Sequence, residues 1–183
     1  MISPRQSFIA FCCCLAGLLV QAPPARGAAP TEVQVKAVFL FNFASFVQWP
    51  PAPTDAAPGP FIIGLLDADE VVGNLEEAVR GEQVDGRPLQ VRRYRNLDEV
   101  GDCRILFIGR AHRGQLAKVL GRLDGRGTLT VSDMDDAARN GVMIQLANEK
   151  NRLRLLINVD AAQAAGLVIS SNLLRPAEII STR

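Results

Sequence analysis

The sequence predicts an α/β fold: a single domain on a largely parallel (mixed) central sheet, with helices on both faces and an antiparallel edge hairpin. Between residues 61 and 132, short apolar runs alternate with segments of helical spacing, which is typical of parallel strands joined by helices. Two strand-like segments, 141–146 and 152–158, flank a turn at 148–151 and predict the hairpin. A length of 183 residues with 48% hydrophobic content fits one compact domain.

Residues 1–29 have the pattern of a secretory signal peptide that is cleaved on export, which leaves residues 30–183 as the folded domain. Arg5 precedes an apolar run over residues 8–20, and a small, proline-containing segment with candidate cleavage sites follows it. The alternative is an N-terminal anchor that is not cut, although the apolar run is shorter than the ~18 residues that span a bilayer. We therefore expect an exported protein.

Residues 31–49 are predicted to form the first helix. Thr31 can accept a hydrogen bond at its start, and the prolines that follow Trp49 end it. On a helical projection the core face contains Phe39, Leu40, Phe43, Phe46 and Val47. Phe41 falls within the opposite, polar stripe and Trp49 at its edge. Either the helix is buried on nearly all sides, or Phe41 and Trp49 belong to a surface that docks a partner.

The later elements follow in order. A proline-rich loop over residues 50–60 leads to a strand at 61–66, and Asp69 is expected to cap the next helix. After the turn at Gly86 we expect strands at 89–94, 104–108 and 129–132, a helix at 113–123, and the hairpin. Asp160 is expected to cap a short helix that ends at Gly166. Ser170 or Ser171 caps a last helix, whose inward residues are predicted to be Leu173, Leu174 and Ile179.

Charge and cysteine content exclude several classes of protein. Cleavage would remove Arg5 and Arg26, which lowers the number of basic groups from 20 to 18, against 19 acidic groups. A nearly neutral domain has no long-range field to attract nucleic acid. Three of the four cysteines lie within the signal segment, so Cys103 alone remains and can form neither an intrachain disulfide nor a zinc site. We interpret Cys103 as a buried structural thiol, with redox sensing or intermolecular pairing as alternatives.

Groups that carry catalysis are scarce. Asp67 and Asp69 follow one predicted strand, and Asp133, Asp135 and Asp136 follow another, but turn formation explains them as well as metal binding does. The sequence contains one histidine, His112, and none of the common catalytic motifs. Arg110 and Arg113 follow a predicted strand and could bind an anion. We expect no enzymatic activity, no cofactor and no metal.

A family resemblance rests on the run from Val35 to Pro50, VKAVFLFNFASFVQWP, which resembles the opening signature of the YfiR-like family. In that family Tyr commonly stands where Phe41 is here. Further similar segments are residues 85–89, 103–108, 129–133, 153–158 and 165–174. The resemblance covers about residues 31–180, which is nearly all of the predicted mature domain.

This resemblance implies a periplasmic regulator of Gram-negative bacteria. In the best-studied system of the family, the protein binds the sensor region of an inner-membrane diguanylate cyclase and represses cyclic-di-GMP synthesis, which controls biofilm formation. An outer-membrane lipoprotein can sequester it, and homodimers are typical. That system also has paired cysteines, whereas this sequence has only Cys103 beyond the signal segment.

Three hypotheses follow for function. The first is a regulator that binds a diguanylate cyclase or another sensor protein. Its leading docking surface is the first helix, with Phe41 and Trp49, and the second candidate is Ile169 with the cap formed by Ser170, Ser171 and Asn172. The second is a periplasmic sensor of a small ligand, with a pocket at strand ends formed by Trp49, Arg110 and Ser170 and continued by Ser171 and Asn172. The third is an enzyme that uses the Asp clusters, and it is the least supported.

Overall fold

The computed structural model describes residues 29–50, 59–150 and 152–181. Nearly all of the predicted signal peptide, residues 1–28, lies outside the described residues, as do residues 51–58 of the predicted proline-rich loop. Among the described residues, no helix is both long enough and apolar enough to cross a membrane.

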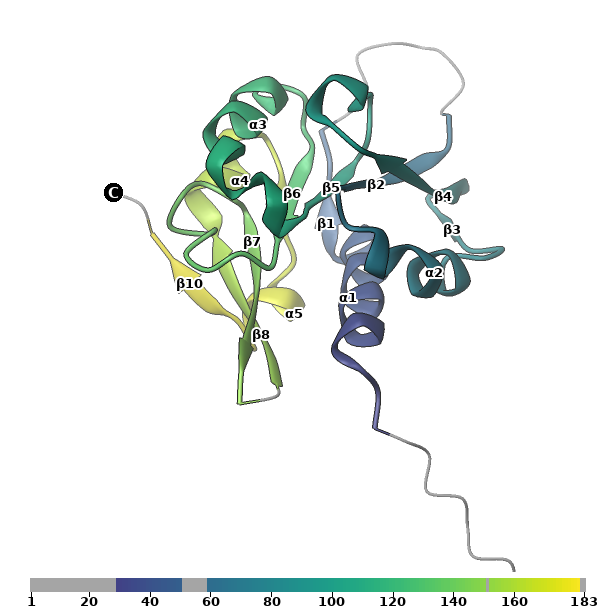
Figure 1. Cartoon of the computed structure of the whole chain (residues 1–183), viewed down its shortest axis with the longest axis horizontal. Helices are drawn as coiled ribbons and strands as arrows, with labels where there is room; N and C mark the ends of the chain where they lie inside the picture. Colours follow the sequence, from purple (N-terminus) through teal and green to yellow (C-terminus); the bar gives the residue numbers. More distant parts are fainter. Residues whose placement is uncertain (1–28, 51–58, 151, 182–183) are drawn as a thin grey trace, which may run out of the picture.

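The described chain forms a mixed sheet of eight strands in the order β10-β8-β7-β6-β5-β2-β4-β3. The five central strands, from β4 to β7, run parallel, and antiparallel pairs flank them: the predicted β7–β8 hairpin and a β3–β4 hairpin at the opposite edge. This arrangement confirms the predicted fold class (Figure 1). The strands are β2 (Phe61–Leu66), β3 (Gln83–Val84), β4 (Arg87–Tyr94), β5 (Ile105–Ile108), β6 (Leu129–Ser132), β7 (Ile144–Glu149), β8 (Arg152–Asn158) and β10 (Glu178–Ile180).

Helices cover both faces of the sheet because strand side chains alternate between two apolar clusters. Ile105 and Phe107 of β5 belong to the cluster beneath α1 (Glu32–Phe46) and α2 (Asp69–Ala78). Leu106 and Ile108 belong to the cluster beneath α3 (Leu116–Leu123). The 3-10 helices η1 (Leu97–Glu99) and η2 (Arg110–Gln115) lie in the connections on either side of β5. All four β5 side chains are fully buried, as expected for a strand covered on both faces.

A second, two-stranded sheet lies at the end of α1. Val47–Gln48 forms β1, which pairs antiparallel with β9 (Val168–Ile169), so that Val47 faces Ile169 and Gln48 faces Val168. Helix α4 (Val159–Ala164) precedes β9, and α5 (Ser171–Leu174) follows it. We call this pair of strands the β1–β9 ribbon.

The first helix confirms its predicted start but ends earlier than predicted. The Thr31 hydroxyl oxygen accepts a hydrogen bond from the Gln34 amide at 3.3 Å, and the Gln34 side chain accepts one from the Thr31 amide at 2.8 Å. The helix ends at Phe46 because Val47 adopts an extended conformation and pairs with β9. Trp49 therefore lies beyond the helix, which corrects its predicted place on a helical face.

Three local predictions near other helix ends were wrong. Asp69 and Asp160 lie within the first turns of α2 and α4, and the Asn158 side chain caps α4 by accepting from the Ala161 amide. The last helix is only α5, which Ser170 caps as predicted. Ile179 does not face inward: it lies in the edge strand β10, where its side chain is 51% exposed and that of its neighbour Ile180 is buried, because successive strand residues point to opposite faces.

Candidate functional site

Helix α1 and the residues that follow it contact the sheet at opposite ends of its parallel strands. Near its start, Lys36 contacts Asp133, which follows the carboxyl end of β6. Just beyond its end, the Trp49 indole nitrogen donates to the carbonyl oxygen of Arg104, which precedes β5, at 3.2 Å. Two groups of the predicted site residues are therefore separated by the length of α1, about 22 Å for 15 residues.

The first group is a cluster of charges that we call the Lys36 cluster: Glu32, Lys36, Arg110 and Asp133. Lys36 Nζ lies 2.6 Å from Glu32 Oε1 and 2.7 Å from Asp133 Oδ2. Arg110 Nε approaches the same Asp133 oxygen at 3.1 Å. The Lys36 and Asp133 side chains are 6% and 5% exposed, whereas that of Arg110 is 61% exposed. A buried ion pair thus has one further cation on its solvent side.

The electrostatics of this cluster keep Lys36 protonated. Burial by itself lowers the pKa of Lys36, but hydrogen bonds to Asp133 and Glu32 outweigh it, so the pKa is raised above its ordinary value. The hydrogen bond from Lys36 lowers the pKa of Glu32 despite the opposing effect of burial. A lysine that stays charged is a poor nucleophile or general base, so the cluster is suited to holding α1 on the sheet. Sequence reasoning missed Lys36, because nothing in its neighbourhood indicates a partner 97 residues away.

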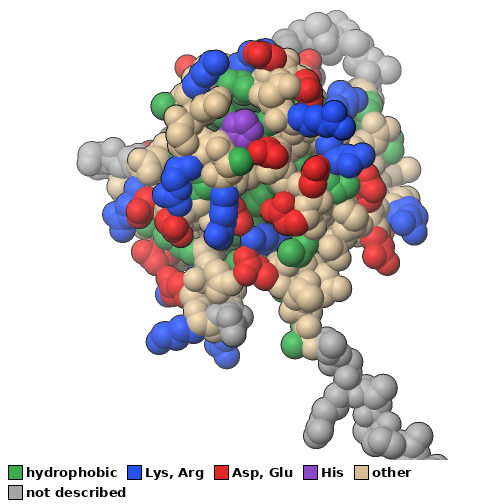
Figure 2. Space-filling model, in the orientation of Figure 1, with side chains coloured by type: hydrophobic (Ala, Val, Ile, Leu, Met, Phe, Trp, Pro, Cys, Tyr) green, Lys and Arg blue, Asp and Glu red, His purple; other side chains and the backbone are tan. Residues whose placement is uncertain are grey.

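The predicted acidic clusters do not converge on one point. Asp67, Asp69, Asp135 and Asp136 are exposed, and only Asp133 is buried. Asp135 pairs with Arg113 at 3.2 Å. Across the described part of the chain, no three or more His, Cys, Asp and Glu side chains gather as a metal site would require. Figure 2 shows acidic and basic side chains interspersed over the visible face.

The second group contains Trp49, Ile169 and Ser170, which the β1–β9 ribbon brings together. The Ser170 amide donates to the Phe46 carbonyl at the end of α1, at 2.9 Å. Ile169 faces Val47 and is 9% exposed. The Trp49 ring packs edge-on against Phe61, with ring centroids 5.0 Å apart. Trp49 is half-buried and Ile169 buried, so both stabilise the ribbon and contribute little surface.

The exposed surface at the ribbon combines two residues that sequence reasoning did not select, Gln48 and Val168, with two that it did, Ser171 and Asn172. Gln48 and Val168 face each other across the two strands, and Val168 is 59% exposed. Ser171 and Asn172, which follow β9, are also exposed. We call these four residues the ribbon surface. The alternation of β9 could have indicated Val168, because successive strand residues point to opposite faces. Phe41 lies off this surface, half-buried against the core of α1.

The pocket predicted from Trp49, Arg110 and Ser170 does not form. Trp49 contacts the residue that precedes β5, whereas Arg110 follows the opposite end of that strand and pairs with Asp133. Ser170 lies with Trp49 at the end of α1, and its side-chain oxygen accepts from the Asn172 amide at 3.3 Å. The prediction placed residues at strand ends without distinguishing the two opposite ends of the sheet.

The two remaining candidate residues are buried on the α3 side of the sheet. Cys103 is a free thiol, and burial, with a smaller effect of Asp102, raises its pKa to about 12. His112 in η2 is 8% exposed, and neither ring nitrogen has a hydrogen-bond partner among the described residues. Cys103 is thus protonated at neutral pH, which disfavours redox chemistry at this thiol.

A search of curated proteins finds no match. The family model described as YfiR/HmsC-like matches residues 33–178, from the first turn of α1 to the start of β10. Because this match covers most of the chain, the protein belongs to the YfiR/HmsC-like family.

Proposed function

We propose that the protein is a periplasmic regulator that binds the sensor region of an inner-membrane signalling protein and represses a diguanylate cyclase. Membership of the YfiR/HmsC-like family supports a periplasmic regulator of this group. Binding alone suffices for such regulation, because a protein that prefers one state of its partner shifts the partner toward that state.

The observation that carries the proposal is the ribbon surface. Val168 projects an apolar side chain that is 59% exposed, from a strand whose other residue, Ile169, is anchored in the core. Gln48 lies opposite it across the two strands, and the exposed polar residues Ser171 and Asn172 follow β9 closely in the chain. An apolar centre with a polar rim on a rigid support is the usual anatomy of a protein-binding surface.

A deletion and complementation experiment tests the proposal. We expect deletion of the gene in its host to raise cyclic-di-GMP, and the unaltered gene to restore the original level. Val168→Asp should fail to restore it, because a charge at the centre of the interface would be desolvated. Ile179→Asp is the matched control, since Ile179 is 51% exposed in β10, which belongs to the eight-stranded sheet and not to the ribbon. Unchanged cyclic-di-GMP after deletion would contradict the repression of a cyclase, and restoration by Val168→Asp would contradict the assignment of this surface.

The proposal also includes export, a homodimer and sequestration by an outer-membrane lipoprotein. Mass spectrometry of the protein from the periplasmic fraction should find an N-terminus near residue 30. Light scattering of the purified mature protein should give twice the mass of one chain. Capture from envelope extracts should recover an inner-membrane sensor protein, and Val168→Asp should reduce that recovery while Ile179→Asp should not.

A further inference from the structure

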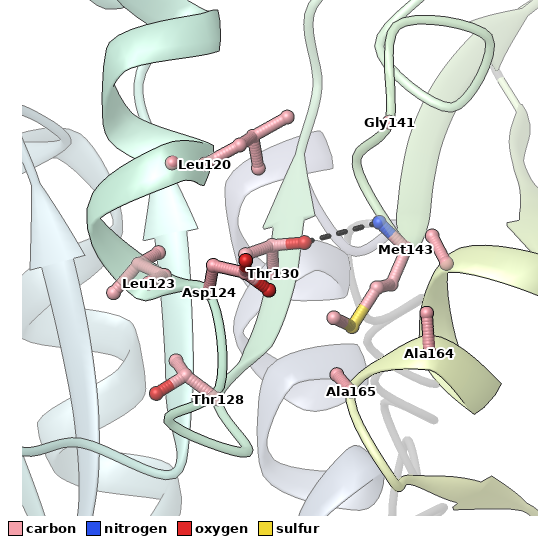
Figure 3. Close-up of a pocket in the computed structure, with 11 residues that line it drawn as sticks. Leu120, Leu123, Asp124, Thr128, Thr130, Gly141, Met143, Ala164 and Ala165 are labelled. Atoms are coloured by element: carbon pink, nitrogen blue, oxygen red, sulfur yellow. Dashed lines mark hydrogen bonds between the residues drawn. The ribbon is translucent and has the colours of Figure 1, made fainter.

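We propose that a cavity between α3 and α4 binds a small apolar molecule whose polar end is neutral or cationic. The cavity has a volume of about 330 Å³ and lies over β6, between the two helices (Figure 3). This inference goes beyond the regulatory function and does not depend on it, because it rests only on the cavity and is tested by direct binding.

Small residues on both walls keep the cavity open. The wall at α4 presents Ala161, Ala164 and, just beyond the helix, Ala165, whose methyl groups extend only a short way from the backbone. On α3, a Cβ atom built on Gly121 would meet nothing within 4 Å. The larger apolar groups that complete the lining are Leu120, Leu123 and Met143. The lining of the cavity is therefore mostly apolar.

The polar groups of the lining restrict the charge of the ligand. The Thr130 hydroxyl oxygen accepts a hydrogen bond from the Met143 amide at 3.1 Å. The Thr128 hydroxyl already donates to the Cys103 carbonyl at 2.9 Å. Asp124 is the acidic residue of the lining and is exposed at the edge of the cavity. A carboxylate there repels an anionic ligand and attracts a cationic one.

The volume indicates the size of the ligand. An engineered apolar protein cavity of about 150 Å³ binds benzene, so a cavity of about 330 Å³ accommodates roughly twice that bulk. A straight chain of about eight carbons, or a fused pair of rings, has this size, and the volume lies at the small end of known ligand sites. Three alkyl probes of equal length therefore suit the cavity and differ only in charge: 1-octanol, octylamine and octanoate.

A methionine signal reports binding at the cavity itself. The sequence has three methionines, and the mature domain retains Met134 and Met143. Met143 lines the cavity, whereas Met134 is buried elsewhere in the α3-side cluster. With the mature protein labelled by carbon-13 at the methionine methyl groups, octanol and octylamine should shift the Met143 signal and leave that of Met134 in place. At about ten times the Kd, either probe should raise Tm by roughly 3 °C.

Variants of the two walls and of the edge test the assignment. Ala164→Leu fills the cavity and should weaken octanol binding at least about tenfold, while Gln163→Leu, its exposed neighbour on α4, should not. Gly121→Leu fills the cavity from α3 and serves if Ala164→Leu fails to fold, as judged by circular dichroism. Asp124→Asn should remove the preference for octylamine over octanoate without changing octanol binding, and Glu76→Gln on α2 is the charge control.

Two results would overturn the assignment of this cavity as a binding site. One is that no probe shifts the Met143 signal of the unaltered protein. The other is a shift that persists undiminished in both filled variants, since the probe would then bind elsewhere. Tighter binding of octanoate than of octylamine would contradict the predicted class of ligand.

Discussion

Lys36 and Asp133 form a buried ion pair, with 2.7 Å between Nζ and Oδ2, although 97 residues separate them in the chain. The pair ties the second turn of α1 to the residue that follows β6, at the carboxyl end of the parallel strands. Arg110 and Glu32 complete the cluster from the solvent side and from α1. The position of α1 on the sheet therefore depends on charge as well as on apolar packing.

Removal of one partner of this pair should be costly. Lys36→Met leaves the Asp133 carboxylate buried with only Arg110 beside it, and we expect a loss of about 3 kcal/mol in the free energy of unfolding. Urea denaturation measures this loss. Lys36→Met combined with Asp133→Leu should be more stable than Lys36→Met alone, because no buried charge remains unpaired.

Arg113→Met provides the control for that experiment. It breaks the Arg113–Asp135 pair, whose side chains are 58% and 85% exposed, and should change stability by less than about 1 kcal/mol because solvent screens the pair. Equal losses for the buried and the exposed pair would contradict a stabilising role of the Lys36 cluster.

Stability should decrease at both extremes of pH. The Glu32 pKa is lowered from 4.5, so its stabilising contribution is complete above pH 4.5 and is lost as pH falls through the folded-state value. The Lys36 pKa is raised from 10.5, so its contribution is complete below pH 10.5 and is lost as pH rises through the folded-state value. Measurement of Tm against pH should show a smaller acidic loss in Glu32→Gln. Glu77→Gln, at an exposed position of α2, should retain the full loss.

Gly109 should tolerate no side chain. A Cβ atom at this position would lie 1.9 Å from the Asp67 carbonyl oxygen, since the backbone segments that follow β2 and β5 are in close contact there. Gly109→Ala is expected to cost at least about 3 kcal/mol in urea denaturation, or to prevent folding. Gly114→Ala meets nothing within 4 Å and should leave stability nearly unchanged. A stable, soluble Gly109→Ala protein would contradict this prediction, because the backbone segments that follow β2 and β5 would then be able to move apart.

Cys103 should resist modification in the folded protein. Its pKa of about 12 leaves far less thiolate than an ordinary thiol near 8.5, by roughly three orders of magnitude at pH 8. In an absorbance assay, a thiol-reactive disulfide releases a coloured thiol when it reacts with the protein. This release should be slow with native protein and rapid with protein unfolded in urea. Cys103→Ser provides the blank, and rapid reaction of native protein would restore the redox hypothesis.

Features that depend on neighbours in sequence were predicted well. The β7–β8 hairpin, the Thr31 cap and the Ser170 cap each rest on a few consecutive residues. The β1–β9 ribbon and β10 were not predicted, because each is a strand of only two or three residues that pairs with a distant segment. Strands this short show almost no periodicity in the sequence. The residues next to Val168 in the chain do not indicate that it pairs with Gln48.

The sequence by itself determined the alternation of strands and helices, the presence of a single cysteine, Cys103, beyond the predicted signal segment, and the family resemblance, because each is carried by local composition or by an ordered series of motifs. Only the tertiary structure decided which residues meet. It placed Trp49 and Arg110 at opposite ends of β5, paired Lys36 with Asp133, and exposed Val168 while burying Ile169. Such contacts depend on the order of strands in the sheet and on the direction in which α1 crosses it, and neither is encoded near the residues concerned.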